Sequence, residues 1–117
     1  MTIRELALAG TVALMLAGGQ LLFKQAAIAP DAKNTLDIFL SVRFLLAILL
    51  YGLSTVLWVI VLQTAPISKA YPIVMIGSAL IPIAAYFLFR EPITVRYLVG
   101  FAIILFGLYL TVSTTGK

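Results

Sequence analysis

Residues 6–23 read LALAGTVALMLAGGQLLF, a run of 18 residues without a charged side chain. Three further uncharged runs, of 25, 20 and 20 residues, occupy positions 44–68, 70–89 and 97–116. A helix that crosses the hydrocarbon core of a bilayer needs roughly 20 apolar residues. The four runs therefore predict four membrane-spanning helices, which leave no room for a soluble domain in a chain of 117 residues.

The composition also indicates a membrane protein. Hydrophobic residues make up 63% of the chain and charged residues 10%, whereas charged residues form about a quarter of an average soluble domain. Neither Cys nor His is present, which removes thiolate metal sites, the usual zinc ligand and the usual general base. We expect one transmembrane domain over residues 1–117, with no enzymatic activity, metal or cofactor. The net charge of +4 predicts cationic flanks at lipid head groups, not a nucleic-acid-binding face.

Helix-breaking residues between the runs define the expected helix bounds. We expect an all-α bundle with helices over about residues 3–25, 36–62, 68–89 and 94–114. The first connection contains Pro30, and Asn34 or Thr35 is a candidate N-cap for the second helix. Pro72 and Pro82 fall inside the third helix, where each removes a backbone hydrogen bond. In a membrane this predicts a bent helix that lies inside a bundle.

The distribution of cations gives little bias for membrane orientation. Three cations fall on the side of the two termini and five on the other side, which favours the second side as cytoplasmic. The two counts become equal when Lys24 and Arg43, which lie at helix ends, are discounted. So weak a bias permits either orientation in the membrane. Because four helices enclose little cavity, we expect a dimer, and its two subunits can be parallel or antiparallel.

Two polar residues stand on the same face of the first helix as small residues. Ala13, Ala17, Gln20 and Lys24 recur at spacings of four, three and four, which places them on one stripe. Lys24 has two interpretations: it snorkels from the helix end to the head groups, or it faces a partner or an aqueous path. Gln20 lies deeper and needs a hydrogen-bond partner, either on another helix or on a substrate.

A second polar cluster lies at the junction of the second and third helices. Gln63 and Lys69 flank the connection, and Trp58 and Tyr71 bracket it within the two helices. Both aromatic residues are typical of an interfacial belt. Alternatively, the Tyr71 hydroxyl points into the bundle, where unwinding at Pro72 exposes carbonyl groups to a substrate.

Two features of the C-terminal third concern packing. Glu91 is expected to pair with Arg90 or Arg96 or to cap the fourth helix, with substrate contact as the alternative. Gly100 and Gly107 are seven residues apart, two helical turns, and form a smooth stripe suited to close packing against another fourth helix. We therefore predict that this stripe is a dimer interface.

These motifs, taken in order, resemble the four-helix members of the drug/metabolite transporter superfamily, which includes EamA-like proteins. The resemblance covers nearly the whole chain. It rests on LAGGQLLFKQA at 16–26, VLWVIVLQ at 56–63, PISKAYP at 66–72, and REPI at 90–93 followed by Gly100 and Gly107. Within the superfamily the chain is most similar to subunits of the aminoarabinose-phosphoundecaprenol flippase.

The resemblance implies a four-helix inner-membrane subunit that pairs with a second such subunit, as a homodimer or a heterodimer. Together the subunits would translocate a lipid-linked sugar for lipid A modification, a change that confers resistance to cationic antimicrobial peptides. Lys24 or Lys69 would attract the phosphate of this substrate. Gln20, Gln63 and Tyr71 would offer hydrogen bonds to its head group.

The chain also resembles the small multidrug resistance family, with one departure. That family carries a glutamate in the first helix, eight residues before a lysine, to exchange protons for cationic drugs. Leu16 occupies this position, and no carboxylate lies between Glu5 and Asp31. Proton-coupled exchange of that design is therefore excluded.

Without that carboxylate, the cations Lys24, Arg43 and Lys69 favour an anionic group such as a phosphate. This agrees with a phosphate-linked lipid as the substrate. Two alternatives stay open: a proton-independent exporter of a small metabolite or drug, and a non-transporting subunit that scaffolds a membrane-bound glycosyltransferase. Binding separates the three, because a flippase binds the lipid-linked sugar, an exporter binds a soluble amphiphile, and a scaffold binds neither.

Overall fold

The computed structural model describes residues 2–31 and 33–113, and their regular structure is helical. Four segments of this part are long and apolar enough to cross a membrane: Ile3–Ala27, Val42–Leu62, Ile67–Phe89 and Val95–Ser113. The expected all-α class and the four spans are confirmed. Thr114, the predicted end of the fourth helix, and Lys117 lie outside the described residues.

Helix α1 (Ile3–Ala27) begins at a capping box that the sequence already carries. The Thr2 hydroxyl accepts a hydrogen bond from the Glu5 backbone N–H at 3.2 Å, and the Glu5 carboxylate accepts one from the Thr2 backbone N–H at 2.8 Å. These reciprocal bonds satisfy amide groups that a helix start leaves free. The helix continues two residues beyond its predicted end at 25, as far as the turn before Pro30.

The predicted helix over 36–62 is wrong in its first turns, because two helices occupy this stretch. A short helix, α2 (Thr35–Phe39), precedes α3 (Val42–Leu62). The Asn34 side chain caps α2, as expected. Ser41 has an extended backbone, and its hydroxyl accepts a hydrogen bond from the Phe44 N–H at 3.2 Å. A serine hydroxyl competes with the helical hydrogen bonds in this way, so a new helix begins after Ser41.

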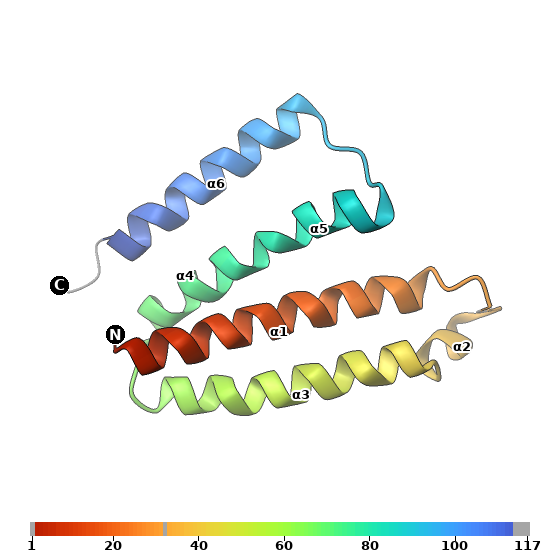
Figure 1. Ribbon diagram of the computed structural model, residues 1–117, viewed down its shortest axis with the longest axis horizontal. Coiled ribbons are helices and arrows are strands. Elements are labelled where there is room, and N and C mark those ends of the chain that lie inside the picture. Colours follow the sequence, from red (N-terminus) through yellow and green to blue (C-terminus); the bar gives the residue numbers. More distant parts are fainter. Residues whose placement is uncertain (1, 32, 114–117) are drawn as a thin grey trace.

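The third span is divided into α4 (Ile67–Ser78) and α5 (Leu80–Phe89), which join at Ala79. Pro82 lies in the first turn of α5, where its missing N–H leaves the Ser78 carbonyl without its helical donor. The predicted bend is therefore a break between two helices that run in broadly the same direction (Figure 1). Little of this span is buried in the single chain, so the expected burial inside a bundle is not met by one protomer.

Helix α6 (Val95–Ser113) follows a loop that starts at Arg90, whose φ of 54° is left-handed. This conformation ends α5 in the manner of a C-cap. The Thr94 hydroxyl then accepts a hydrogen bond from the Tyr97 N–H at 3.1 Å. The loop allows α6 to lean away from α1 and α3, and α6 lies against α4 (Figure 1).

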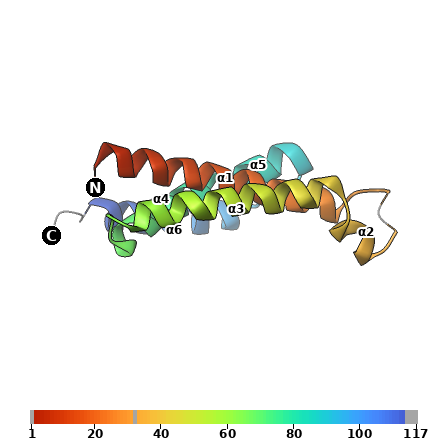
Figure 2. The same cartoon turned by 90° about the horizontal axis from the view of Figure 1, so that it is seen from below.

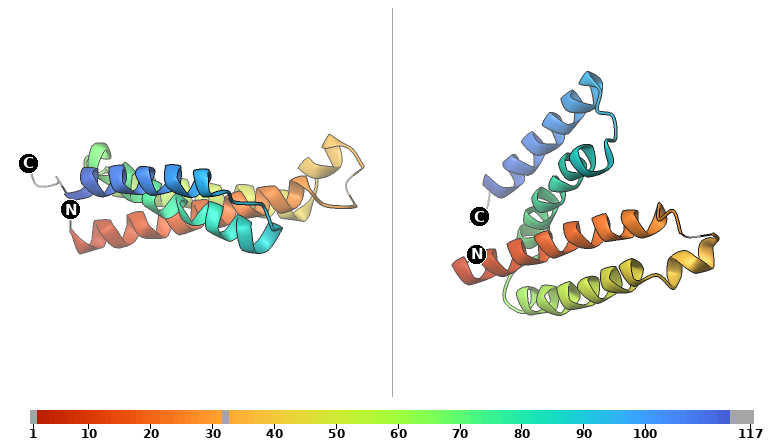
Figure 3. Two further views of the ribbon diagram at one scale, coloured as in Figure 1. Left: turned by 90° about the horizontal axis from the view of Figure 1, so that it is seen from above. Right: turned by 45° about the vertical axis from the view of Figure 1, so that its right-hand side comes forward.

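The helices form a flat arrangement with overall dimensions of 53 × 37 × 17 Å. Helix α1 lies between α3 and α4 (Figure 1), and the edge-on views in Figure 2 and in the left panel of Figure 3 show the small depth. Many large apolar side chains are exposed on α3, α5 and α6. A bilayer or a second subunit therefore has to cover the broad faces.

Small residues allow the central helices to approach closely. Ala13 and Ala17 are buried in α1, as the stripe on this helix predicted. A Cβ atom added to Gly77 of α4 would overlap the Cβ of Ala13. The backbones of α4 and α1 therefore approach closely where these two residues meet. Such crossings are typical of membrane helices, which associate through packing in the absence of a hydrophobic driving force.

Candidate functional site

The Gln20 amide is bonded to a neighbouring helix. Its Nε2 group donates a hydrogen bond to the Tyr51 hydroxyl of α3. The Tyr51 ring fits against Gly19, where an added Cβ would lie 2.7 Å from two ring carbons. The Phe23 ring contacts it with centroids 5.4 Å apart. Of the two interpretations of Gln20, the structure supports a hydrogen bond between helices. The partner, Tyr51, was not predicted from the sequence, although a tyrosine inside an apolar run indicates a hydroxyl that needs a hydrogen bond.

Lys24 forms an ion pair with Glu91. The Nζ and Oε2 atoms are 3.7 Å apart, and the side chains are 45% and 48% exposed. The pair joins the last turn of α1 to the loop between α5 and α6. The expectation that Glu91 pairs with Arg90 or Arg96 is wrong, because the fold brings the end of α1 beside this loop.

A neutral pocket of about 110 Å³ lies between α1, α3 and α4. It is lined by Val12, Leu16, Ser54, Thr55, Trp58, Tyr71 and Val74. The Trp58 and Tyr71 rings meet edge to face with centroids 6.0 Å apart. The hydroxyls of Ser54 and Thr55 donate to the Tyr51 carbonyl at 2.7 and 2.9 Å. Tyr71 lines this pocket but is 52% exposed. The unwinding expected at Pro72 is wrong, because α4 continues as a helix through this residue.

The five predicted substrate residues do not converge on one point. Gln63 ends α3 and Lys69 lies in the first turn of α4, at the same end as the start of α1. Lys24 lies 19 residues after Glu5 along α1, about 28 Å further at the rise of an α-helix. The two lysines therefore lie near opposite ends of the helical layer.

Glu5 is a buried carboxylate in the first turn of α1. Its side chain is 7% exposed. Beyond the capping box, its Oε2 atom accepts a hydrogen bond from the Thr64 hydroxyl at 2.5 Å. This contact ties the turn between α3 and α4 to the start of α1. The pattern Thr2-x-x-Glu5 is the sequence signal for part of this arrangement.

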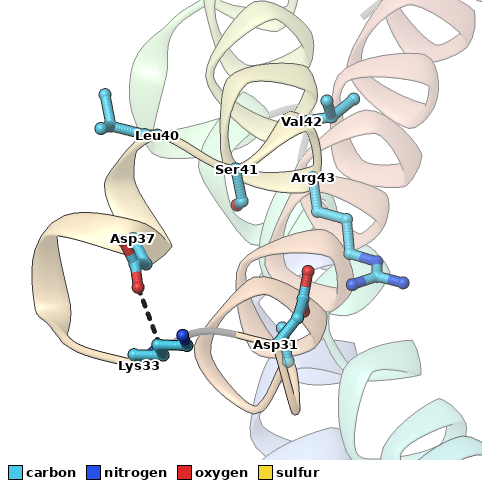
Figure 4. Close-up of a pocket in the computed structure, with 8 residues that line it drawn as sticks. Asp31, Lys33, Asp37, Leu40, Ser41, Val42 and Arg43 are labelled. Atoms are coloured by element: carbon cyan, nitrogen blue, oxygen red, sulfur yellow. Dashed lines mark hydrogen bonds between the residues drawn. The ribbon is translucent and has the colours of Figure 1, made fainter.

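A larger cavity, of about 790 Å³, opens beside α2 and was not predicted (Figure 4). We call it the loop cavity; it is lined by Ala29, Asp31, Lys33, Asp37, Leu40, Ser41, Val42 and Arg43. The Asp37 carboxylate accepts a hydrogen bond from the Lys33 backbone N–H at 2.9 Å. The cavity arises because the break at Ser41 turns α2 away from α3.

Four apolar spans, a neutral pocket between three of them and charged groups confined to their ends define a small multi-pass membrane protein. The chain belongs to the EamA-like transporter family, whose sequence pattern matches residues 6–113. No solved structure matches it.

Similar proteins are named as probable 4-amino-4-deoxy-L-arabinose-phosphoundecaprenol flippase subunits ArnE. The protein of Serratia proteamaculans (strain 568) is 41% identical over 100 residues, which cover 85% of this chain and 87% of the relative. That of Enterobacter sp. (strain 638) is 39% identical over 83% of this chain and 86% of its own length. That of Yersinia pestis (strain Pestoides F) is 36% identical over 85% and 88%. The superfamily expected from the motifs is confirmed.

Proposed function

We propose that this chain is one subunit of an inner-membrane flippase for undecaprenyl-phosphate-linked aminoarabinose, the activity named for its relatives. The substrate would carry its polyprenyl tail in the lipid while its head group crosses beside α1, α3 and α4. No covalent chemistry is required of the chain. The lipid-linked aminosugar would reach the outer face of the inner membrane, where it would serve the modification of lipid A.

The neutral character of the pocket around Leu16 carries this proposal. A transporter that exchanges protons for hydrophobic cations needs a carboxylate where the cation binds, because an anion both attracts the substrate and carries the proton. Leu16, Trp58 and Tyr71 line this pocket, and its remaining lining is also uncharged. An anionic lipid phosphate would meet no repelling carboxylate there, which favours a phosphate-linked substrate over a cationic drug.

Lys24 and Lys69 would contact the phosphate at the two ends of its path. The stretch of α1 from Glu5, which bonds Thr64 in the turn before α4, to Lys24 is about 28 Å long, close to the hydrocarbon thickness of a bilayer, about 30 Å. Lys24 would release Glu91 and bind the phosphate at one end, while Lys69 and Gln63 would bind the head group at the other. Gln20 and Tyr71 would offer hydrogen bonds between these points.

A second four-helix subunit would complete the path. The pocket of about 110 Å³ is far below the volume range of small-molecule sites, which begins near 300 Å³. A sugar head group therefore needs walls that one chain does not supply. Gly100 and Gly107 have open space beside them on α6, and we propose that this stripe packs against the partner, whether identical or not.

Outward presentation of the lipid-linked aminosugar in cells tests the proposal. An impermeant amine reagent labels the aminosugar only when it reaches the outer leaflet. Cells that lack the chain should show low labelling, and restoring the chain should raise it. Lys24→Ala should lower labelling at normal membrane levels, Lys24→Arg should retain most of it, and the exposed cation Arg96, changed to Ala, serves as the control.

Unchanged labelling in cells without the chain would overturn the proposed function. Export of a soluble amphiphile would then favour a small-molecule exporter, and loss of a co-purifying glycosyltransferase would favour a scaffold. Unchanged labelling with Lys24→Ala alone would remove the role of Lys24 and leave the flippase function in place.

A further inference from the structure

The loop cavity carries charges of both signs at one end of the layer. Its volume of about 790 Å³ lies within the range of small-molecule sites, about 300–1,000 Å³. Asp31 comes from the loop after α1 and Arg43 from the first turn of α3. In Figure 4 the two side chains extend from these segments toward the space between them.

Three of these charged side chains have no intramolecular partner among the described residues. Among the described residues the ion pair joins Lys24 to Glu91, which do not line the loop cavity. No hydrogen bond there involves the charged group of Asp31, Lys33 or Arg43. Asp37 differs, because its carboxylate already holds the Lys33 backbone N–H. Two cations and one carboxylate are therefore free to bind a ligand with complementary charges.

The edge of the loop cavity is apolar. Leu40 and Val42 line it and are 68% and 71% exposed. They flank the junction of α2 with α3, whose membrane-spanning segment begins at Val42. Charged lining beside exposed apolar side chains suits a ligand whose head is polar and whose tail lies in lipid.

We propose that the loop cavity binds a lipid head group that combines a phosphodiester with a primary ammonium. Arg43, assisted by Lys33, would bind the phosphodiester through charge-assisted hydrogen bonds, and Asp31 would bind the ammonium. This inference rests on the proposed function, because aminoarabinose-phosphoundecaprenol has both groups in one head. Arg43 also lines the smaller cavity beside Gln25, which follows Lys24 at the end of α1, so the loop cavity would load the path.

Lipid binding by the complete complex, purified in nanodiscs, tests this inference. The probes are aminoarabinose-phosphoundecaprenol, an undecaprenyl-phosphate-linked neutral sugar, and phosphatidylethanolamine, whose head also combines both charges. Arg43→Gln should weaken binding of the aminosugar lipid about tenfold, the effect expected for loss of one charged hydrogen bond. Arg43→Lys should retain part of it. Arg96→Gln, which removes an exposed cation outside the cavity, should leave binding unchanged.

Asp31→Asn provides the sharper test because it should change selectivity. The wild-type complex should bind the aminosugar lipid more tightly than the neutral-sugar lipid. Asp31→Asn should remove this preference without weakening the binding of the neutral-sugar lipid. Wild-type binding by both Asp31→Asn and Arg43→Gln would overturn the inference. Equal binding of phosphatidylethanolamine would overturn the role of the loop cavity in loading the path and would assign the cavity to bulk lipid, whose head group has the same two charges. Outward labelling by the wild-type chain in either case would leave the proposed function standing.

Discussion

The Gln20 amide of α1 donates a hydrogen bond to the Tyr51 hydroxyl of α3, beside a notch left by Gly19. An amide and a phenol that face hydrocarbon without partners would each lose hydrogen bonding to water. Their mutual bond therefore fixes the register of α1 against α3. It also holds Gln20 at the level between the neutral pocket and Lys24, where the proposed head group would pass.

Tyr51→Phe should destabilise the packing of α1 on α3. The substitution keeps the ring against Gly19 and removes only the acceptor for Gln20. Hydrogen bonds between membrane helices contribute about 0.5–2 kcal/mol, and the free energy of unfolding in mixed micelles should fall by this amount. Tyr109→Phe, on the exposed surface of α6, is the matched control. Equal stability of both variants would show that the Gln20 bond does not form.

Gly77→Ala should separate α4 from α1. The added methyl group would overlap the Cβ of Ala13, and overpacking of this kind costs about 1–3 kcal/mol. The yield of folded protein and its thermal midpoint should fall. Gly52→Ala adds the same methyl group where nothing lies within 4 Å and should be neutral or stabilising. A neutral result for Gly77→Ala would contradict the close crossing of α1 and α4.

Uncharged runs and breakers were enough to predict the four spans, since membrane crossing depends on length and apolarity. They did not predict the breaks at Ser41 and Ala79. At Ser41 a single hydroxyl replaces a helical hydrogen bond by a cap, and at Ala79 the effect of Pro82 appears three residues upstream. Such local competition changes no hydropathy average, so it is not visible in the pattern of apolar runs.

The candidate site was predictable in its residue types but not in its pairings. Gln20 and Lys24 were found because polar groups are costly in an apolar helix. Their partners, Tyr51 and Glu91, come from segments distant in the sequence, and only the packing of the helices brings them together. The loop cavity was missed for the same reason, since it exists only because α2 turns away at Ser41.

Thr64→Val should loosen the turn between α3 and α4. The Thr64 hydroxyl is the donor to the buried Glu5 carboxylate, and valine keeps the shape while removing the bond. Faster hydrogen exchange of the backbone amides in this turn and a lower thermal midpoint are expected. Thr11→Val is a suitable control because the Thr11 hydroxyl bonds only within its own helix. Unchanged exchange in the turn would show that Glu5 does not anchor it.

Gly107→Leu should reduce association with the second subunit. A leucine would fill the smooth stripe on α6 that we propose as the interface, while the single chain has open space there and should fold normally. Crosslinking in native membranes should give much less dimer than for the wild type. Gly52→Leu, on another open helix surface, should keep the wild-type yield. A yield of crosslinked dimer from Gly107→Leu equal to that of the wild type would show that the interface lies elsewhere.

Reconstitution into liposomes tests the flippase function most directly. The complex that carries this chain is inserted into vesicles that contain aminoarabinose-phosphoundecaprenol, and an impermeant amine reagent is added outside. In vesicles without the complex, only the lipid of the outer leaflet is labelled. With the complex, the labelled fraction should rise beyond that share as inner-leaflet lipid is carried outward. Labelling that stays at the outer-leaflet share in vesicles with folded, assembled complex would contradict the proposed function.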